Sequence, residues 1–118
     1  MNIKFGDVLL ADFGKNNGSI QGGCRPCVVI QNDIGNLYSP TLIVVPLTTE
    51  MKKLNMPNHR ILYRSTCNGL KRDSMVLGEQ ICVINKDVVK DKLGRVTEKE
   101  WNVVESAFKA SFPKTLNA

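Results

Sequence analysis

Residues 21–33 read QGGCRPCVVIQND and join a glycine-led turn directly to a run of strand-forming residues. The turn holds a C-x-x-C pair, Cys24 and Cys27, which brackets Arg25 and a proline. A thioredoxin-type redox centre needs its first cysteine at a helix N-terminus, where the helix dipole lowers the thiol pKa. Because the residues after Cys27 favour a strand, we interpret the stretch as a turn that presents Arg25 at the entrance to a sheet.

The remaining cysteines and the single histidine give little support for a metal site. A structural zinc site would need a second cysteine pair at short spacing, whereas Cys67 and Cys82 are single and far apart. We expect Cys27 and Cys82 to be small apolar side chains of the core. His59 lies in an expected loop, and we interpret it as a surface residue. We therefore expect no metal and no cofactor.

Length and charge narrow the class of protein. The 118 residues predict one domain, 1–118, large enough to bury a core. A net charge of +5 fits either a soluble surface or an anionic partner. No apolar run reaches the length of a membrane span, and the N-terminus lacks the apolar region of a signal peptide. We expect a cytoplasmic protein with reduced thiols and no membrane partner.

Runs of β-forming residues extend outward from this stretch in both directions. They predict strands over residues 7–13, 26–31, 41–47, 60–63, 74–77 and 80–84. Polar, glycine-rich or proline-broken segments predict exposed loops over 14–23 and 50–58, and a turn over 32–40. A glycine at position 78 predicts a bulge or sharp bend before the last of these strands.

Two helical signals follow. Residues 86–93 predict a short helix, with Asn85 as its N-cap and Gly94 just past its end. Thr97 and Glu100 form a T-x-x-E capping box. Beyond it, Pro113 ends a helix whose apolar stripe is Trp101, Val104, Phe108 and Phe112. The sequence thus predicts a mainly β protein, a small, strongly bent antiparallel sheet capped by a C-terminal helix.

A group of polar residues offers chemistry without a metal. Arg25 is a fixed cation whose fork matches phosphate, and Thr48 and Thr49 offer hydroxyls at a predicted strand end. Such groups could stabilise a phosphodiester attacked by its own 2′-hydroxyl, a reaction that requires RNA. From spacing alone, these side chains are equally compatible with an ordinary surface.

Three longer segments carry a family resemblance. GDVLLADF (residues 6–13), GSIQGGCRPCVVIQNDIGNLYSPTLIVVPLTT (18–49) and RDSMVLGEQICVI (72–84) resemble the MazF/PemK family of toxin endoribonucleases. The resemblance implies an SH3-like barrel with a C-terminal helix and a homodimer. It also implies metal-independent cleavage of single-stranded RNA at short sequences, with 2′,3′-cyclic phosphate (or 3′-phosphate) and 5′-hydroxyl ends. A small, acidic, MazE-like antitoxin would neutralise the toxin.

The family's essential arginine and threonine fall on Arg25 and Thr48. Because an arginine pKa lies far above neutral, we expect Arg25 to act through its charge more than by proton transfer. The resemblance and the residue types implicate further positions in RNA binding: Gln21, Gly22, Gln31, Asn32, Asn36, Thr49, Glu79 and Gln80. Residues 14–21 are expected to cover bound RNA, where the antitoxin would compete. Gly78 stands where the resemblance leads us to expect an aliphatic residue, a difference that concerns the specificity of RNA recognition rather than catalysis.

Two other interpretations stay open. One is a CcdB-like toxin of the same fold that binds DNA gyrase without enzymatic activity. Such toxins act through an exposed Trp-Gly-Ile at the C-terminus, whereas this chain ends in FPKTLNA and has its only tryptophan in the predicted helix. The other is a nucleic-acid-binding barrel that has lost catalysis, against which the presence of both Arg25 and Thr48 speaks.

Overall fold

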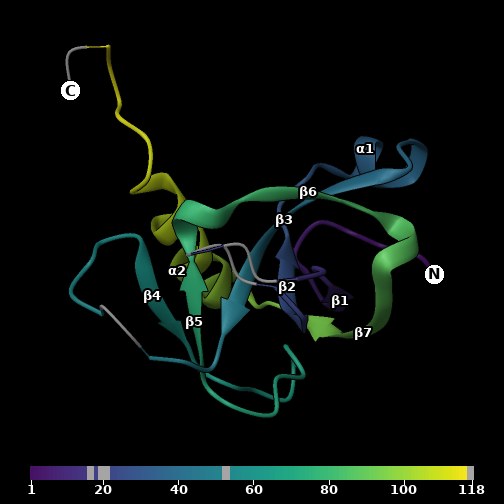
Figure 1. Cartoon of the computed structure of the whole chain (residues 1–118), viewed down its shortest axis with the longest axis horizontal. Helices are drawn as coiled ribbons and strands as arrows, with labels where there is room; N and C mark the ends of the chain where they lie inside the picture. The colour runs from purple at the N-terminus through teal and green to yellow at the C-terminus, as the bar shows by residue number, and fades with distance from the viewer. Residues whose placement is uncertain (16–17, 19–21, 52–53, 117–118) are drawn as a thin grey trace.

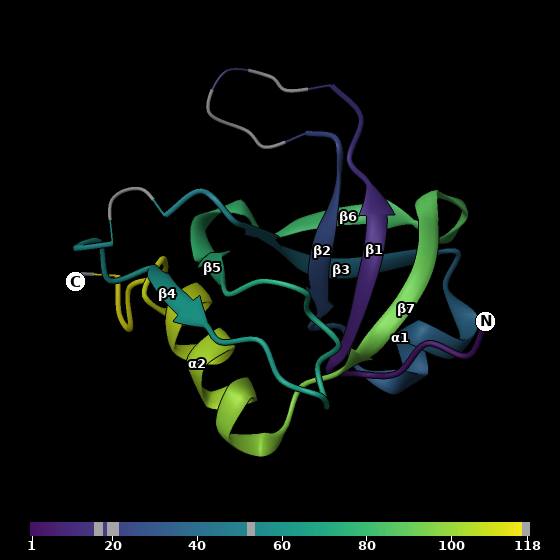
Figure 2. The same cartoon turned by 90° about the horizontal axis from the view of Figure 1, so that it is seen from below.

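The computed structural model describes residues 1–15, 18, 22–51 and 54–116. Antiparallel pairing joins the strands in the order β4-β5-β3-β2-β1-β7, with β6 paired to β3 beside this path. The sheet curls strongly around its middle, and helix α2 lies beside β4 and β5 (Figures 1 and 2). The strands are β1 (Asp7–Asp12), β2 (Cys24–Val29), β3 (Thr41–Thr48), β4 (His59–Leu62), β5 (Ser74–Leu77), β6 (Cys82–Asn85) and β7 (Val89–Arg95). The helices are α1 (Asp33–Tyr38) and α2 (Glu98–Lys109), with 3₁₀ turns η1 (Gly78–Gln80) and η2 (Lys86–Val88).

Strand β3 connects the two halves of the sheet. Its middle pairs with β2 on one edge, from Val44 to Pro46, while its first half pairs with β6 on the other edge. Its last two residues, Leu47 and Thr48, pair with β5. The sheet therefore bends along β3, and the end of this strand lies where the two halves meet.

Both faces of the central strands are buried, which explains their nearly continuous apolar sequence. One face contributes Val8, Val28, Val45 and Leu47 to a core completed by α2. The alternate residues, including Leu9, Cys27 and Val44, enter a second core with Ile84 of β6. Alternation along each strand thus assigns neighbouring residues to different cores.

The C-terminal helix begins where its capping box predicts. Thr97 Oγ1 accepts the Glu100 backbone N–H at 3.2 Å, and Glu100 Oε1 accepts the Thr97 N–H at 2.9 Å. The helix ends at Lys109, so the assignment of Phe112 to its apolar stripe was wrong. Phe112 is 59% exposed, because backbone bonds from Ser111 and Phe112 to carbonyls three residues earlier tighten the chain beyond the helix.

The predicted helix over 86–93 is absent. The segment forms the turn η2 and then β7, which pairs with β1. Asn85 makes no side-chain cap, and Gly94 lies within β7 rather than after a helix. A Cβ at Gly94 would lie 2.3 Å from the Cys67 carbonyl oxygen, so this glycine permits two backbones to approach closely. The outer edge of β1, seventy or more residues earlier in the chain, decides the conformation of this segment.

Two smaller differences concern turns. The segment 32–40, predicted to be a turn, contains the six-residue helix α1. The strand predicted over 80–84 begins at Cys82, because the bend expected at Gly78 extends through Gln80 as η1. None of the helices in the described part of the chain has the length and apolarity to cross a membrane.

Gly69 should be sensitive to substitution. Its φ is +70°, and an added Cβ would lie 1.9 Å from the Leu93 carbonyl oxygen. Gly14 has a similar φ of +77° but nothing within 4 Å of an added Cβ. We expect Gly69→Ala to lower the free energy of unfolding by about 3 kcal/mol or more, from left-handed strain plus overpacking.

The matched control, Gly14→Ala, should cost about 1 kcal/mol from backbone strain alone. Urea denaturation followed by circular dichroism measures both variants. Equal losses in the two variants would contradict the packing argument.

Candidate active site

Arg25 connects the turn before β2 to the end of β3. Its Nε and Nη2 donate to the Gly22 carbonyl oxygen at 2.9 and 2.6 Å, and its Nη1 donates to the Leu47 carbonyl oxygen at 3.4 Å. The register Cys27↔Pro46, continued by two residues, places Arg25 opposite Thr48. These acceptors are neutral carbonyls, and no carboxylate in the described ranges forms an ion pair with Arg25. The guanidinium is therefore held in place while its charge is not neutralised by a carboxylate there.

Thr48 ends β3 and is only 6% exposed. Its Oγ1 accepts the Glu50 backbone N–H at 3.2 Å, which fixes the hydroxyl at the strand end. Arg25 and Thr48 thus lie on facing strand ends, with the arginine bonded to the carbonyl of the residue before Thr48. A half-buried cation beside a fixed hydroxyl is suited to bind an oxyanion such as a phosphate.

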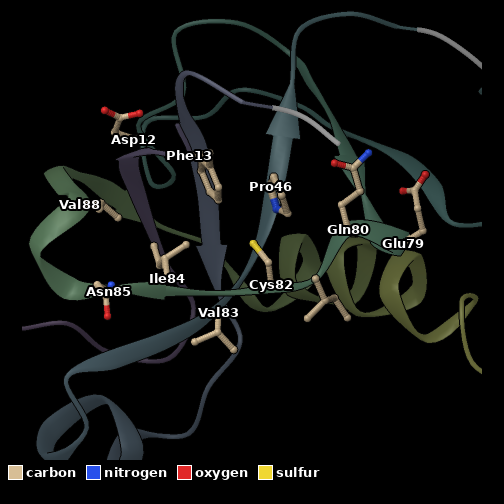
Figure 3. A pocket seen from close by; sticks show the side chains of 11 residues that line it. Asp12, Phe13, Pro46, Glu79, Gln80, Cys82, Val83, Ile84, Asn85 and Val88 are labelled. Carbon is tan, nitrogen blue, oxygen red and sulfur yellow. The ribbon is translucent and has the colours of Figure 1, made fainter. Parts of the chain in front are cut away.

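A pocket of about 490 Å³ opens near these strand ends (Figure 3). We call it the Gln80 pocket. Pro46 lines it and, two residues before Thr48, projects from the same face of β3. Apolar side chains and the Cys82 thiol meet Asp12, Asn85, Glu79 and Gln80 around the pocket. The full lining is Asp12, Phe13, Pro46, Glu79, Gln80, Ile81, Cys82, Val83, Ile84, Asn85 and Val88.

The expectation that His59 is a surface residue was wrong. His59 is 7% exposed, and its Nε2 lies 2.7 Å from Glu79 Oε2. Register explains the contact, since His59 in β4 pairs with Leu77 at the end of β5, and η1 starts at the next residue. Histidine and glutamate are twenty residues apart in sequence, so no local signal marks the pair.

Gly78 explains why an aliphatic residue does not precede Glu79. An added Cβ would lie 2.2 Å from the Ala107 carbonyl oxygen of α2 and 2.7 Å from the Asn58 carbonyl oxygen. The Gly78 N–H also donates to that Asn58 carbonyl at 3.0 Å. The turn that carries Glu79 and Gln80 is therefore packed directly on the backbone of α2.

The amides at the other end of β2 hold α1. Asn32 caps it, accepting the Gly35 N–H at 2.8 Å. Gln31 Nε2 donates to Asn36 Oδ1 at 3.1 Å, and Asn36 Nδ2 returns a bond to the Gln31 carbonyl at 2.9 Å. Asn36 is 3% exposed. Gln31 follows Arg25 by six positions, which span about 20 Å of extended chain, so the structure does not bring this group to Arg25.

The other expected site residues occupy three different places. Gly22 supplies the carbonyl that holds Arg25. Thr49 lines a second pocket of about 300 Å³ together with Leu10 and Pro26, which pair across β1 and β2. Since side chains alternate along a strand, this pocket lies on the face of the sheet opposite to Cys27. Gln21 lies outside the described residues, as does most of the loop expected to cover RNA.

The cysteines of the C-x-x-C pair lie apart. Cys27 is buried, as expected. The loss of solvent around the thiol raises its pKa to about 12, with a smaller contribution from the nearby charge of the Cys82 thiolate. Cys24 is exposed. The two cysteines are three positions apart in β2, which separates their Cα atoms by about 10 Å, beyond the roughly 7 Å that a disulfide allows. Within the described ranges, no group of three or more His, Cys, Asp or Glu side chains is placed to hold a metal ion.

The chain is thus a small β protein with a bent antiparallel sheet, and it carries a cation and a hydroxyl at adjacent strand ends. The profile of the PemK-like, MazF-like toxins of type II toxin–antitoxin systems matches residues 4–112. The chain belongs to this family of toxins.

Relatives and solved structures agree with this membership. Endoribonuclease EndoA of Bacillus subtilis is 41% identical over 94% of this chain and 95% of its own length. Endoribonuclease MazF of Staphylococcus saprophyticus is 43% identical over 92% of this chain and 90% of its own length. MazF of Deinococcus radiodurans superimposes with a TM-score of 0.77 at 18% identity, covering 93% and 96%. A mycobacterial endoribonuclease in complex with its cognate antitoxin superimposes with a TM-score of 0.74 at 24% identity, covering 92% of this chain and 93% of that chain. The expected fold class is thereby confirmed.

Thiol labelling should separate the two cysteines. At about pH 8 iodoacetamide should modify exposed Cys24 quickly, while Cys27 should stay protonated and unlabelled until the protein unfolds. Mass spectrometry of the digested protein measures the labelling. Peroxide treatment of the folded protein should leave no Cys24–Cys27 disulfide, and a high yield of that disulfide without unfolding would contradict the strand geometry.

Proposed function

We propose that this protein is a toxin that cuts single-stranded RNA at specific sequences without a metal ion. The observation that carries the proposal is the bond from the Arg25 guanidinium to the Leu47 carbonyl oxygen, which holds the cation at the end of β3, next to Thr48. Endoribonuclease activity is supported by the names of two relatives that match this chain over nearly its whole length at 41% and 43% identity.

The reaction proceeds by internal displacement. The 2′-hydroxyl oxygen attacks the adjacent phosphorus as its proton passes to water, and the P–O5′ bond breaks. The departing 5′ oxygen takes a proton from water, so that a 2′,3′-cyclic phosphate and a 5′-hydroxyl form. Charge grows on the non-bridging oxygens, where the guanidinium of Arg25 and the hydroxyl of Thr48 donate hydrogen bonds. Since a guanidinium keeps its proton at neutral pH, Arg25 contributes a fixed charge and position more than a transferable proton.

The Gln80 pocket receives unpaired bases next to the cut. Its apolar wall accommodates a base plane, while Glu79 and Gln80 offer acceptors and donors to base edges. Only a single strand can turn a base into such a pocket, which accounts for the substrate class. Thr49 and Asn32 contact RNA further from the cut, and Gln31 and Asn36 act indirectly by holding α1.

An exposed apolar surface supports a homodimer. Ile34, Leu37 and Tyr38 of α1 are exposed, and α1 contacts β3. Beside them Ile43 of β3 and Val83 of β6 form an exposed cross-strand pair. We call these five residues the α1 surface. A second copy of the chain would cover these apolar side chains, which are unusual in such density on a monomer.

The proposed regulator is a small acidic antitoxin, which binds over Arg25 and competes with RNA. The net charge of +5 favours such a partner, and related solved structures contain a cognate antitoxin. We place the protein in the cytoplasm, where its thiols stay reduced.

Gyrase binding is not favoured. That activity requires an exposed tryptophan near the C-terminus, whereas Trp101 packs against Phe5 and Phe108, at centroid distances of 4.5 and 5.8 Å. A barrel without catalysis is disfavoured by the fixed Arg25 and Thr48 side chains.

Cleavage of a long defined RNA in EDTA tests the proposal. The wild-type protein should give discrete cuts with 5′-hydroxyl ends. Arg25→Ala and Thr48→Ala should each fold and lose about 100-fold or more in rate, as removal of one oxyanion donor does elsewhere. Arg25→Lys, which keeps the charge but not the fork, should stay strongly impaired. Wild-type cleavage by any of these folded variants would remove that residue from the mechanism.

Light scattering tests the homodimer. We expect Leu37→Glu and Val83→Glu to convert a dimer into a monomer, because a dimer through the α1 surface would bury the new carboxylate. Tyr63→Glu, an equally drastic change at another exposed apolar residue, should leave the dimer intact. A wild-type monomer, or a dimer in all three variants, would exclude this surface as the interface.

A further inference from the structure

We propose that His59 is a positioning residue for base recognition: it holds Glu79 so that the carboxylate selects a base bearing an amino group. The inference rests on the proposed ribonuclease function and adds a residue outside the family motifs described above. Its basis is the 2.7 Å contact between His59 Nε2 and Glu79 Oε2, in which the histidine is buried and the glutamate is partly exposed.

Burial makes His59 a rigid anchor. Its side chain is 6% exposed against 35% for Glu79. The His59 backbone N–H donates to the Met56 carbonyl at 3.0 Å, and its β-pairing to Leu77 fixes the strand position. A partly exposed glutamate otherwise samples many rotamers, and ordering it on substrate binding would weaken binding. The bond to His59 fixes the carboxylate before RNA arrives.

The backbone below Glu79 is equally constrained. Gly78 lies against the Ala107 carbonyl of α2 and donates to the Asn58 carbonyl at 3.0 Å, so η1 has little room to shift. His59 and Gly78 therefore fix the Glu79 side chain and its backbone from opposite ends. Glu79 lines the Gln80 pocket, so this fixed carboxylate belongs to the wall that a base would meet.

The chemistry of a carboxylate defines what it recognises. An ionised glutamate only accepts hydrogen bonds, and it repels phosphate. With Oε2 at His59, Oε1 remains as an acceptor for an exocyclic amine. Cytosine, adenine and guanine carry such amines on their Watson–Crick edges, whereas uracil presents carbonyls there and has no amine. The pair should therefore favour an amino-bearing base over uracil at one position of the recognition sequence.

Cleavage kinetics on short RNAs tests the proposal. The cut site found in the long RNA is placed in an oligonucleotide, and each base in turn is replaced. We expect Glu79→Gln to reduce kcat/KM most for one amino-bearing base, and His59→Leu to reduce discrimination at the same position by about 10- to 100-fold. His59→Gln, which retains a donor, should recover part of it.

Three comparisons separate positioning from simple loss of stability. The double variant His59→Leu/Glu79→Gln should discriminate no worse than Glu79→Gln, because both changes remove the same contact. Leu62→Val, a buried change in the same strand β4, should lower the melting temperature without altering base discrimination. Equal losses of kcat/KM for every RNA in folded His59→Leu would overturn the inference.

A measurement without RNA checks the contact itself. His59 is the only histidine, so its ring ¹⁵N resonances need no assignment. Glu79→Gln should move the Nε2 resonance, whereas Glu105→Gln, which removes a carboxylate on the outer face of α2, should not. An unmoved resonance would overturn the inference alone. A folded wild-type protein that cuts no RNA would overturn the proposed function and this inference together.

Discussion

The site depends on one set of hydrogen bonds, those from the Arg25 guanidinium to the carbonyl oxygens of Gly22 and Leu47. A guanidinium has five donors and cannot lose its charge. Carbonyl oxygens satisfy these donors without neutralising the cation, whereas a carboxylate would do both. The turn before β2 is thereby fastened to the end of β3, and a positive charge is retained beside Thr48. The same three hydrogen bonds thus fix the position of the guanidinium and leave its positive charge without a carboxylate partner.

This arrangement requires the unusual position of β3. Because β3 pairs with β2 and β6 in one half of the sheet and with β5 in the other, its last residues lie at the bend. Alternation then directs Pro46 and Thr48 to the face opposite Leu47, which is buried against the α2 core. The Gln80 pocket follows from the same bend, since η1 connects β5 to β6 across the two halves.

Local signals predicted much of this fold, and contacts distant in sequence account for the rest. Apolar runs marked the central strands, and the Thr97 capping box marked the start of α2. The helix predicted over 86–93 failed because pairing with β1 overrides local propensity. The burial of His59 could not be predicted from the sequence for a similar reason, since only the pairing of β4 with β5 brings His59 next to Glu79. Arg25 and Thr48 were predicted as catalytic residues from the family resemblance, because their spacing alone did not distinguish them from surface residues.

The stretch 21–33 contains β2 and extends beyond both of its ends, and the residues at the two ends have different roles. At its start, the Gly22 carbonyl oxygen holds the Arg25 guanidinium in the turn that we propose to bind phosphate. At its finish, Gln31 and Asn36 bond to each other so completely that Asn36 is almost inaccessible. Amides used in this way cannot also read a base without first breaking α1. In the proposed function, any effect of these amides on RNA would pass through α1, which presents the apolar residues of the proposed dimer surface. The stretch thus contains both residues that we propose to contact the substrate and residues that hold the framework, and hydrogen bonding distinguishes them.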